Sequence, residues 1–522
     1  MKKLKWLLSI TVVSILIMLT FCTLPVEAET NGFTVVHGVL TRYTGTNSVV
    51  DIPGNLGITK IGDYAFLKCS ITSVTIPKGV TTIGDFAFEE CSGLKSITIP
   101  KGITTIGDSA FHKTSISKPI IINSGKTLCY VPSSTKRYTI PNSVKTIGSG
   151  AFNGCSVLAK VKIPNSVTTI KSSSFYNCSN LISISIPKSV TTIGEFAFYG
   201  CNRLSSITIP KGIKTIGRSA FSSTSIPKPI IINSGKTLSY VPALYESYTI
   251  PKSIKAIGGG AFNCCKNLSS VTIPNSVTTI GNFAFSECSK LSSIIVPSSV
   301  RVIGESAFSN CSKLTSITIP GSVKIIQNNT FNECNDLKTI TLPNGITSIG
   351  EGAFLHCGLT TITIPNSVTT IGKGAFYGCS NLVSITIPKG IKTIGSYAFV
   401  ETSIPDPIII NDGKTLYYVP ASYTNYIIPD SITAIGAGAF QGCSKITSVT
   451  IPNNVTSIGE HAFFECSLLA SITIPTSVTT IGDYAFYKCS SLNSKSLTIY
   501  GFVNSFAQKI AKQNNFGFVA LG

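Results

Sequence analysis

A unit of 23 residues recurs from about Ile52 to Ile474, and no other feature restricts the possible folds of this chain as strongly. Its fullest form reads I-P-x-x-V-T-x-I-G-x-x-A-F-x-x-C-x-x-L-x-x-I-x, and seventeen Ile-, Val- or Leu-Pro pairs mark its copies. Self-similarity at this period is typical of a solenoid, in which each unit buries its apolar face only by stacking on its neighbours. Function is therefore expected on an extended surface and not in the pocket of a compact domain.

Two short strands are predicted in each unit. Leu94, Ile97 and Ile99 are apolar while the residues between them are mostly polar, and such alternation with β-branched residues indicates a strand. Pro100 ends this strand because proline has no amide donor for the ladder. A second extended piece is expected over 103–106, before a glycine that suits a corner with positive φ or close backbone approach.

A single helical turn is predicted after that corner. Ala65 and Phe66 lie four and three residues before Cys69, which places all three on one side of a helical or 3₁₀ turn. Stacked units are expected to form parallel ladders about 4.8 Å apart.

These repeats resemble the BspA-like leucine-rich repeat family, whose variant is written LxxIxIP followed by xxVTxIGxxAFxxC. The resemblance covers nearly everything after the N-terminal leader. It implies a right-handed β-solenoid or horseshoe of short parallel strands and one-turn helices. It also implies a secreted or surface protein that acts in adhesion and interaction, whereas the periodicity alone indicates only a scaffold.

The two ends of the chain differ from the repeats. Residues 1–28 are predicted to be a secretory signal, because a basic start precedes an apolar run and a small-x-Ala ending at Ala28. An uncleaved membrane anchor is the alternative, since the run approaches the roughly 20 residues that span a bilayer. Cleavage would leave a secreted or cell-surface chain with no transmembrane segment.

The mature chain is predicted to have three regions. Residues 29–58 form an N-terminal capping β-hairpin region, residues 59–495 form the repeat array, and residues 496–522 form a C-terminal cap. A capping helix is expected to start at Asn504 or Ser505, because apolar residues then share one helical face.

Three repeats are 41 residues long, and each contains the same addition, near 115–139, 225–249 and 403–427. Two extended runs around a polar turn predict a β-hairpin in each addition. The hairpins are either recognition elements or duplicated capping units. On the recognition interpretation, the expected exposed anchors are Tyr130, Tyr240, Tyr417 and Tyr418, because tyrosine provides large contact area at small entropy cost.

The chain carries a formal net charge of +20, which falls to +18 without the leader. A secreted protein with this balance attracts polyanions, but the lysines recur singly in turns and form no block in the sequence. The outward strand positions are mostly Ser and Thr. Lys160 and Lys162 break this uniformity and are candidate contact sites.

Fourteen of the seventeen cysteines occupy one repeat position, three residues after the Phe. Thr114, Thr224 and Thr402 replace them in the repeats with hairpins, which favours packing as free buried thiols over disulfides. One such ligand per repeat makes no metal-binding pair, and the four histidines are scattered. No catalytic residues and no cofactor are predicted, so the chain is not expected to be an enzyme.

The leading functional hypothesis is a secreted, noncatalytic binding protein that mediates adhesion to proteins or glycans of host or neighbouring cells. The alternative is a structural protein whose basic charge holds it on anionic wall polymers. No specific nucleic-acid partner is predicted. Purely electrostatic retention should be lost in moderate salt, which separates the two hypotheses.

Overall fold

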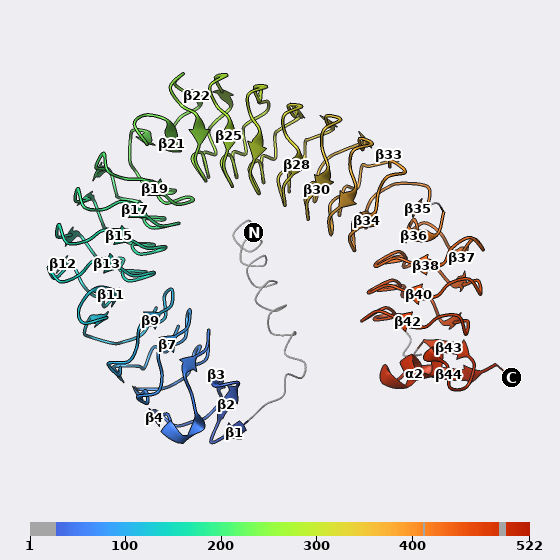
Figure 1. Ribbon diagram of the computed structural model, residues 1–522, viewed down its shortest axis with the longest axis horizontal. Coiled ribbons are helices and arrows are strands. Elements are labelled where there is room, and N and C mark those ends of the chain that lie inside the picture. Colours follow the sequence, from blue (N-terminus) through green and yellow to red (C-terminus); the bar gives the residue numbers. More distant parts are fainter. Residues whose placement is uncertain (1–27, 411–412, 490–496, 522) are drawn as a thin grey trace. The chain divides into compact units, whose positions relative to one another are not determined.

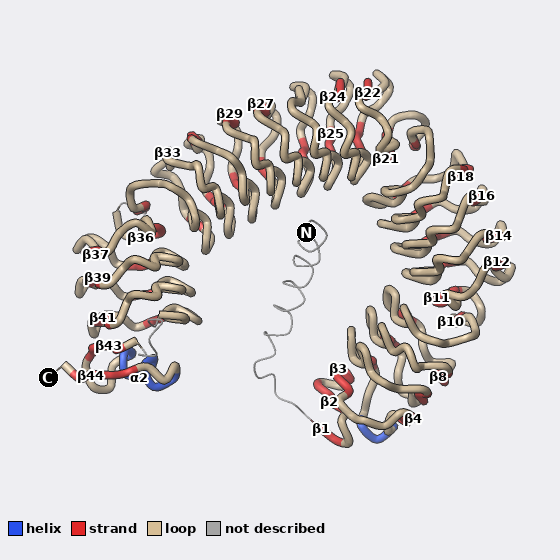
Figure 2. Tube along the Cα trace, turned by 180° about the vertical axis from the view of Figure 1, so that it is seen from behind, coloured by secondary structure: helices blue, strands red, loops and turns tan. Residues whose placement is uncertain are grey.

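The computed structural model describes residues 28–410, 413–489 and 497–521 (Figure 1). The chain divides into two compact units, Met1–Pro227 and Lys228–Gly522, each of which is a β-solenoid. The predicted secretory signal lies outside the described residues, apart from Ala28. Strands are short segments within coils made mainly of loops and turns (Figure 2).

The dipeptide before each glycine corner forms the first ladder of parallel strands. In Met1–Pro227 its members are β3 (Val39–Tyr43), β5 (Lys60–Ile61), β7 (Thr82–Ile83), β9 (Thr105–Ile106), β11 (Thr127–Tyr130), β13 (Thr146–Ile147), β15 (Thr169–Ile170), β17 (Thr192–Ile193) and β19 (Thr215–Ile216). In Lys228–Gly522 they are β21 (Thr237–Tyr240), β23 (Ala256–Ile257), β25 (Thr279–Ile280), β26 (Val302–Ile303), β28 (Ile325–Ile326), β30 (Ser348–Ile349), β32 (Thr370–Ile371), β34 (Thr393–Ile394), β36 (Thr415–Tyr418), β38 (Ala434–Ile435), β40 (Ser457–Ile458) and β42 (Thr480–Ile481). Strands pair at identical repeat positions, as Ile83 does with Ile106.

The residues before each proline form the second ladder, as predicted. The first unit contains β4 (Val49–Asp51), β6 (Ser73–Thr75), β8 (Ser96–Thr98), β12 (Arg137–Thr139), β14 (Lys160–Lys162), β16 (Ser183–Ser185) and β18 (Ser206–Thr208). The second contains β22 (Ser247–Thr249), β24 (Ser270–Thr272), β27 (Ser316–Thr318), β29 (Thr339–Thr341), β31 (Thr361–Thr363), β33 (Ser384–Thr386), β37 (Asn425–Ile427), β39 (Ser448–Thr450) and β41 (Ser471–Thr473). Ser or Thr side chains point outward from most of these strands.

The third side of each coil consists of β-turns, so the expected one-turn helices are wrong. The amides of Tyr64, Phe66 and Lys68 donate to carbonyls of the next coil over 2.8–3.0 Å, while the amides between them close turns within the segment. Tyr64 and Lys68 have φ of 57° and 60°. A helix requires every amide to bond within its own segment, whereas here alternate amides bond to the neighbouring coil.

Close approach between coils, and not positive φ, explains the corner glycine. A Cβ on Gly372 would lie 2.5 Å from the amide nitrogen of Glu351 in the preceding coil. Positive φ occurs instead at the turn residues that follow the corner.

Columns of identical apolar residues fill each coil. The rings of Phe285 and Phe308 stack at 5.4 Å with planes 1° apart, and Phe308 stacks on Phe331 at 5.7 Å. The Cys311 thiol donates to the carbonyl of Phe285. Offset ring pairs of this kind add about 0.5–1.5 kcal/mol beyond area burial, so the core is a line of repeated contacts between neighbours.

The three additions are β-hairpins, as predicted. Their first strands are β10 (Ile120–Ile122), β20 (Ile230–Ile232) and β35 (Ile408–Ile410), each paired antiparallel with the following strand of the first ladder. Within the first unit, β11 then pairs parallel with β13. Each hairpin therefore joins the first ladder and does not protrude as a free arm.

Each end of the repeat array carries a cap. At the start, β1 (Ala28–Thr30), β2 (Phe33–Val36) and β3 form an antiparallel sheet, and a 3₁₀ turn follows at Gly54–Leu56. At the other end, β43 (Thr498–Gly501) and β44 (Gly517–Ala520) extend the second ladder around α2 (Phe506–Gln513). Ser505 is the N-cap of α2, but its side chain makes no capping hydrogen bond.

The corner geometry predicts opposite effects of alanine at two glycines. Gly372→Ala should lower the free energy of unfolding by about 1–3 kcal/mol, because a backbone must shift to admit the methyl group. A Cβ on Gly321 would meet only open space, and the φ of Gly321 is not positive, so Gly321→Ala should be neutral or stabilise by about 0.4–1 kcal/mol. Urea denaturation of the two variants measures the difference; equal midpoints would contradict the close-approach explanation.

Candidate functional site

Tyr130, the first predicted anchor, is a core residue with only 7% of its surface exposed. Its ring packs edge-on against Phe111 at 5.9 Å, and its hydroxyl donates to the carbonyl of Ile116. Thr114 Oγ1 lies 3.4 Å from the same hydroxyl. The hairpin coil lacks the Ala-Phe turn, so Tyr130 fills the space where the next Phe would stack.

The same explanation holds for Tyr418. Tyr418 packs against Phe399 and bonds with Thr402, and Tyr240 is equally buried. The expected exposure is therefore wrong for Tyr130, Tyr240 and Tyr418. One sequence signal could have shown this: Thr replaces Cys in the repeats with hairpins, where a hydroxyl partner for tyrosine is required.

Tyr417 is half-buried, with its ring lying over Gly436 of the following coil. Burial raises the pKa of Tyr417. Its role in binding stays a prediction, because only part of its ring reaches the surface.

Lys160 and Lys162 are exposed on β14, as expected, and the fold adds further charge beside them. Register pairs Lys160 with Arg137 and Lys162 with Thr139, and the exposed Lys136 precedes Arg137. Sequence reasoning missed Lys136 and Arg137 because they belong to the preceding coil.

A longer array that contains many basic residues is formed by the residues that directly precede the strands of the first ladder. We name the residues at this position the basic column. Backbone hydrogen bonds join many of its members in consecutive coils, as from Lys145 to Lys126 and from Lys255 to Lys236, both 2.8 Å, while at a hairpin the amide bonds within the hairpin, as Lys126 does to Ile122. Its members in Met1–Pro227 are Thr59, Thr81, Thr104, Lys126, Lys145, Thr168, Thr191 and Lys214. In Lys228–Gly522 they are Lys236, Lys255, Thr278, Arg301, Lys324, Thr347, Thr369, Lys392, Lys414, Thr433, Thr456 and Thr479.

Every Lys and Arg of the basic column is exposed, and no acidic residue occupies any of its positions. Further lysines flank it on the proline turn, at Lys78, Lys101, Lys188, Lys211, Lys252 and Lys389, where Asp430 is the acidic exception among the described residues. The lysines that are single in the sequence are therefore grouped along one edge of each unit.

Acidic residues gather at the opposite end of the same short strands, just after the corner glycine. Asp63 and Asp85 accept hydrogen bonds from amides of the following coil, and Asp108 bonds to Ser109. Burial raises the pKa of Asp108. Asp63 and Asp85 thus support the backbone of the following coil, at the end of the strands away from the basic column.

The cysteines are free throughout the described residues, which confirms the prediction. Burial raises the pKa of Cys155 and Cys311 to about 12. The thiols at the repeated cysteine position donate to carbonyls of a neighbouring coil, such as that of Val131 or Phe285. They are packing residues, because a protonated buried thiol is neither a nucleophile nor a metal ligand.

The described residues contain no cluster of three or more His, Cys, Asp or Glu side chains placed to hold a metal ion. Nor does the described part include a helix long and apolar enough to cross a membrane.

A family model described as the BspA type leucine rich repeat region matches residues 59–130, 125–242, 239–326, 302–419 and 411–514. The chain belongs to this family. Its members share a noncatalytic repeat scaffold, and no catalytic family is indicated.

Solved structures of leucine-rich repeat proteins from bacteria are similar to this chain. A leucine rich cell surface protein from Faecalibacterium prausnitzii A2-165 is 28% identical over 70% of this chain and 95% of its own, with a TM-score of 0.36. A leucine-rich repeat protein from Eubacterium ventriosum ATCC 27560 is 25% identical over 70% and 89%, with a TM-score of 0.38. One from Bacteroides ovatus ATCC 8483 is 24% identical over 96% and 100%, with a TM-score of 0.30. None of the functionally curated proteins matches the chain.

Burial of the thiols predicts that they react much more slowly in the folded chain than in the unfolded chain. With the pKa of Cys155 and Cys311 raised to about 12, roughly one such thiol in ten thousand is ionised at pH 8. At that pH, a thiol reagent should leave the buried cysteines of the folded protein unmodified. In denaturant without reductant, the same reagent should label all of them. A shortfall of reactive thiols in the denatured chain would reveal disulfides and contradict the free-thiol assignment.

Proposed function

We propose that this protein is a secreted or cell-surface, noncatalytic binding protein whose basic column holds anionic polymers of a cell surface or wall. The observation that carries the proposal is that every position of the column after Gly38, which precedes β3, is Thr, Lys or Arg, with each charge exposed. The polymers include anionic glycans of host or neighbouring cells and anionic wall polymers.

The spacing of the column suits a repeating ligand. Stacked strands lie about 4.8 Å apart, so Lys126 and Lys145 in consecutive coils present charges on the scale of neighbouring groups in a polyanion. Each contact at an exposed site is weak, but contacts along one polymer chain reinforce each other through high effective concentration. Affinity should therefore grow with polymer length.

The basic column also lowers the stability of the protein when no ligand is bound. Like charges directly opposite each other in a ladder destabilise the sheet, and Lys236 beside Lys255 is such a pair. The salt bridges of the described residues join other lysines, such as Lys313 and Lys488, to acids outside the column. A bound polyanion would relieve the repulsion, so the column is better suited to a ligand than to stability.

The phosphate-rich polymer polyphosphate is a direct probe of the basic column. The double variant Lys126→Glu and Lys145→Glu should bind long-chain polyphosphate at least about thirtyfold more weakly in low salt, since each of the two cations near an anionic surface contributes about 1 kcal/mol. Binding of the parent chain should also weaken steeply as salt rises. Fluorescence anisotropy of labelled polyphosphate measures both effects, with labelled dextran as the uncharged polymer.

The matched control is Lys95→Glu with Lys338→Glu, which removes the same charge from exposed lysines outside the column. Equal weakening by the two double variants would show that net charge alone acts, and would contradict a column-specific site. Comparing heparin with purified teichoic acid then separates surface glycans from wall polymers as the preferred ligand.

A further inference from the structure

The aromatic rings on the turn side end abruptly at the last repeat coil. His461 stacks on Tyr484 at 5.4 Å with planes 18° apart, and Phe464 stacks on Tyr487 at 5.7 Å with planes 23° apart. β42 is the terminal strand of the first ladder. In the part of the chain that the structure describes, no further repeat coil follows over the outer faces of the Tyr484 and Tyr487 rings.

The rings of Tyr484 and Tyr487 are exposed to solvent. Tyr484 is 56% exposed and Tyr487 is 50% exposed, and their centroids lie 5.8 Å apart at right angles. We name these two residues the terminal tyrosines. Tyr484 has a φ of 54°, the left-handed conformation that the turn imposes at this position in other coils as well, as at Tyr64 and Phe283.

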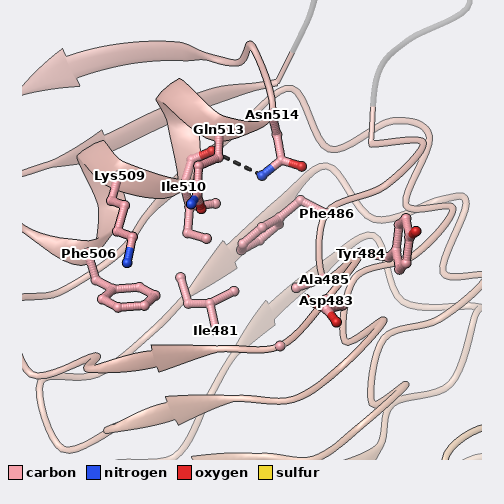
Figure 3. A pocket seen from close by; sticks show the side chains of 11 residues that line it. Ile481, Asp483, Tyr484, Ala485, Phe486, Phe506, Lys509, Ile510, Gln513 and Asn514 are labelled. Atoms are coloured by element: carbon pink, nitrogen blue, oxygen red, sulfur yellow. Dashed lines mark hydrogen bonds between the residues drawn. The ribbon is translucent and has the colours of Figure 1, made fainter. Parts of the chain in front are cut away.

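Tyr484 borders a cleft of about 370 Å³ between the last repeat coil and α2. Figure 3 shows Tyr484 on one side of this cleft and the side chains of Lys509, Ile510 and Gln513 on the helix side, with Phe486 between them. The floor is apolar, formed by Ile481, Phe486 and Ile510. The cleft occupies the space beside α2 into which another coil would otherwise continue.

The rim of the cleft is polar and close to neutral. It carries one carboxylate, Asp483, and one ammonium group, Lys509, together with the amides of Gln513 and Asn514. Asn514 Nδ2 donates to the carbonyl of Ile510, which leaves its Oδ1 as an acceptor.

The ring columns next to the cleft are balanced in charge as well. Lys488 forms an ion pair with Glu465 at 2.7 Å and lies over the Phe464 ring. Burial lowers the pKa of His461, so this ring is uncharged at neutral pH. The surroundings of the terminal tyrosines thus contrast with the basic column and do not favour an anion.

We propose that the terminal tyrosines and the adjoining cleft bind one or two sugar rings of a neutral glycan. A pyranose ring has an apolar face of C–H groups that can continue the stack on a tyrosine, and a rim of hydroxyls for carboxylate, amide and ammonium partners. The lining of the cleft is mainly polar, which suits a ligand rich in hydroxyl groups. This site is independent of the polyanion function proposed above.

Isothermal titration of the full mature chain with cellohexaose, maltohexaose and N-acetylchitohexaose tests the proposal. Tyr484→Asn, which suits the left-handed backbone but removes the ring, should weaken binding of the preferred saccharide at least fivefold. Tyr484→Phe keeps the ring and should stay within about twofold of the parent chain. Binding should persist in high salt and in the Lys126→Glu, Lys145→Glu variant, because neither change affects ring stacking.

The matched control is Tyr64→Asn at the same repeat position. Tyr64 is 47% exposed with a φ of 57°, but its ring is stacked on Phe86 of the following coil at 5.2 Å. This variant should leave binding unchanged. The proposal is overturned if none of the three saccharides binds, if both tyrosine-to-asparagine variants weaken binding equally, or if a phenylalanine-rich peptide displaces the saccharide through this cleft and binds more tightly.

Discussion

The structure depends on hydrogen bonds between identical positions of successive coils. Both strand ladders and the alternate amides of the β-turns donate to the neighbouring coil, so each coil is held in register on three sides. A shift of one residue would turn every inward side chain outward, and this strongly favours a single register. In-register stacking then converts each position of the repeat into a column that runs along its unit.

The columns have different consequences inside and outside the coil. Inside, identical residues reinforce each other, because Phe rings stack face to face and thiols at the repeated cysteine position donate to carbonyls of the neighbouring coil. Outside, alignment brings like charges together, which costs stability and creates a field that attracts a polyanion. The same register that builds the core therefore builds the surface that we propose for binding.

Interruptions of the columns were the hardest features to predict. Each hairpin was recognised from its turn and extended runs, yet Tyr130 and Tyr418 were assigned to the surface, because sequence cannot show that a missing Ala-Phe turn leaves a space for them. The helical turn after the corner was also predicted wrongly, since Ala65, Phe66 and Cys69 have spacing that fits both a helix and successive β-turns. At the C-terminal cap, the periodicity indicated a helix but not the cleft between that helix and the last repeat coil.

Recurrence of the repeat was enough to predict the solenoid, and the pattern within it was enough to predict the strands and the packing role of the cysteines. The turn residues of the three additions were enough to predict the hairpins. Which residues from different repeats meet became clear only from the folded chain. Lys126 and Lys145 are 19 positions apart in the sequence, and Arg137 and Lys160 are 23 apart, yet each pair lies on adjacent coils. The charged and aromatic columns result from the stacking of coils. They can therefore be predicted only when the register between coils is known.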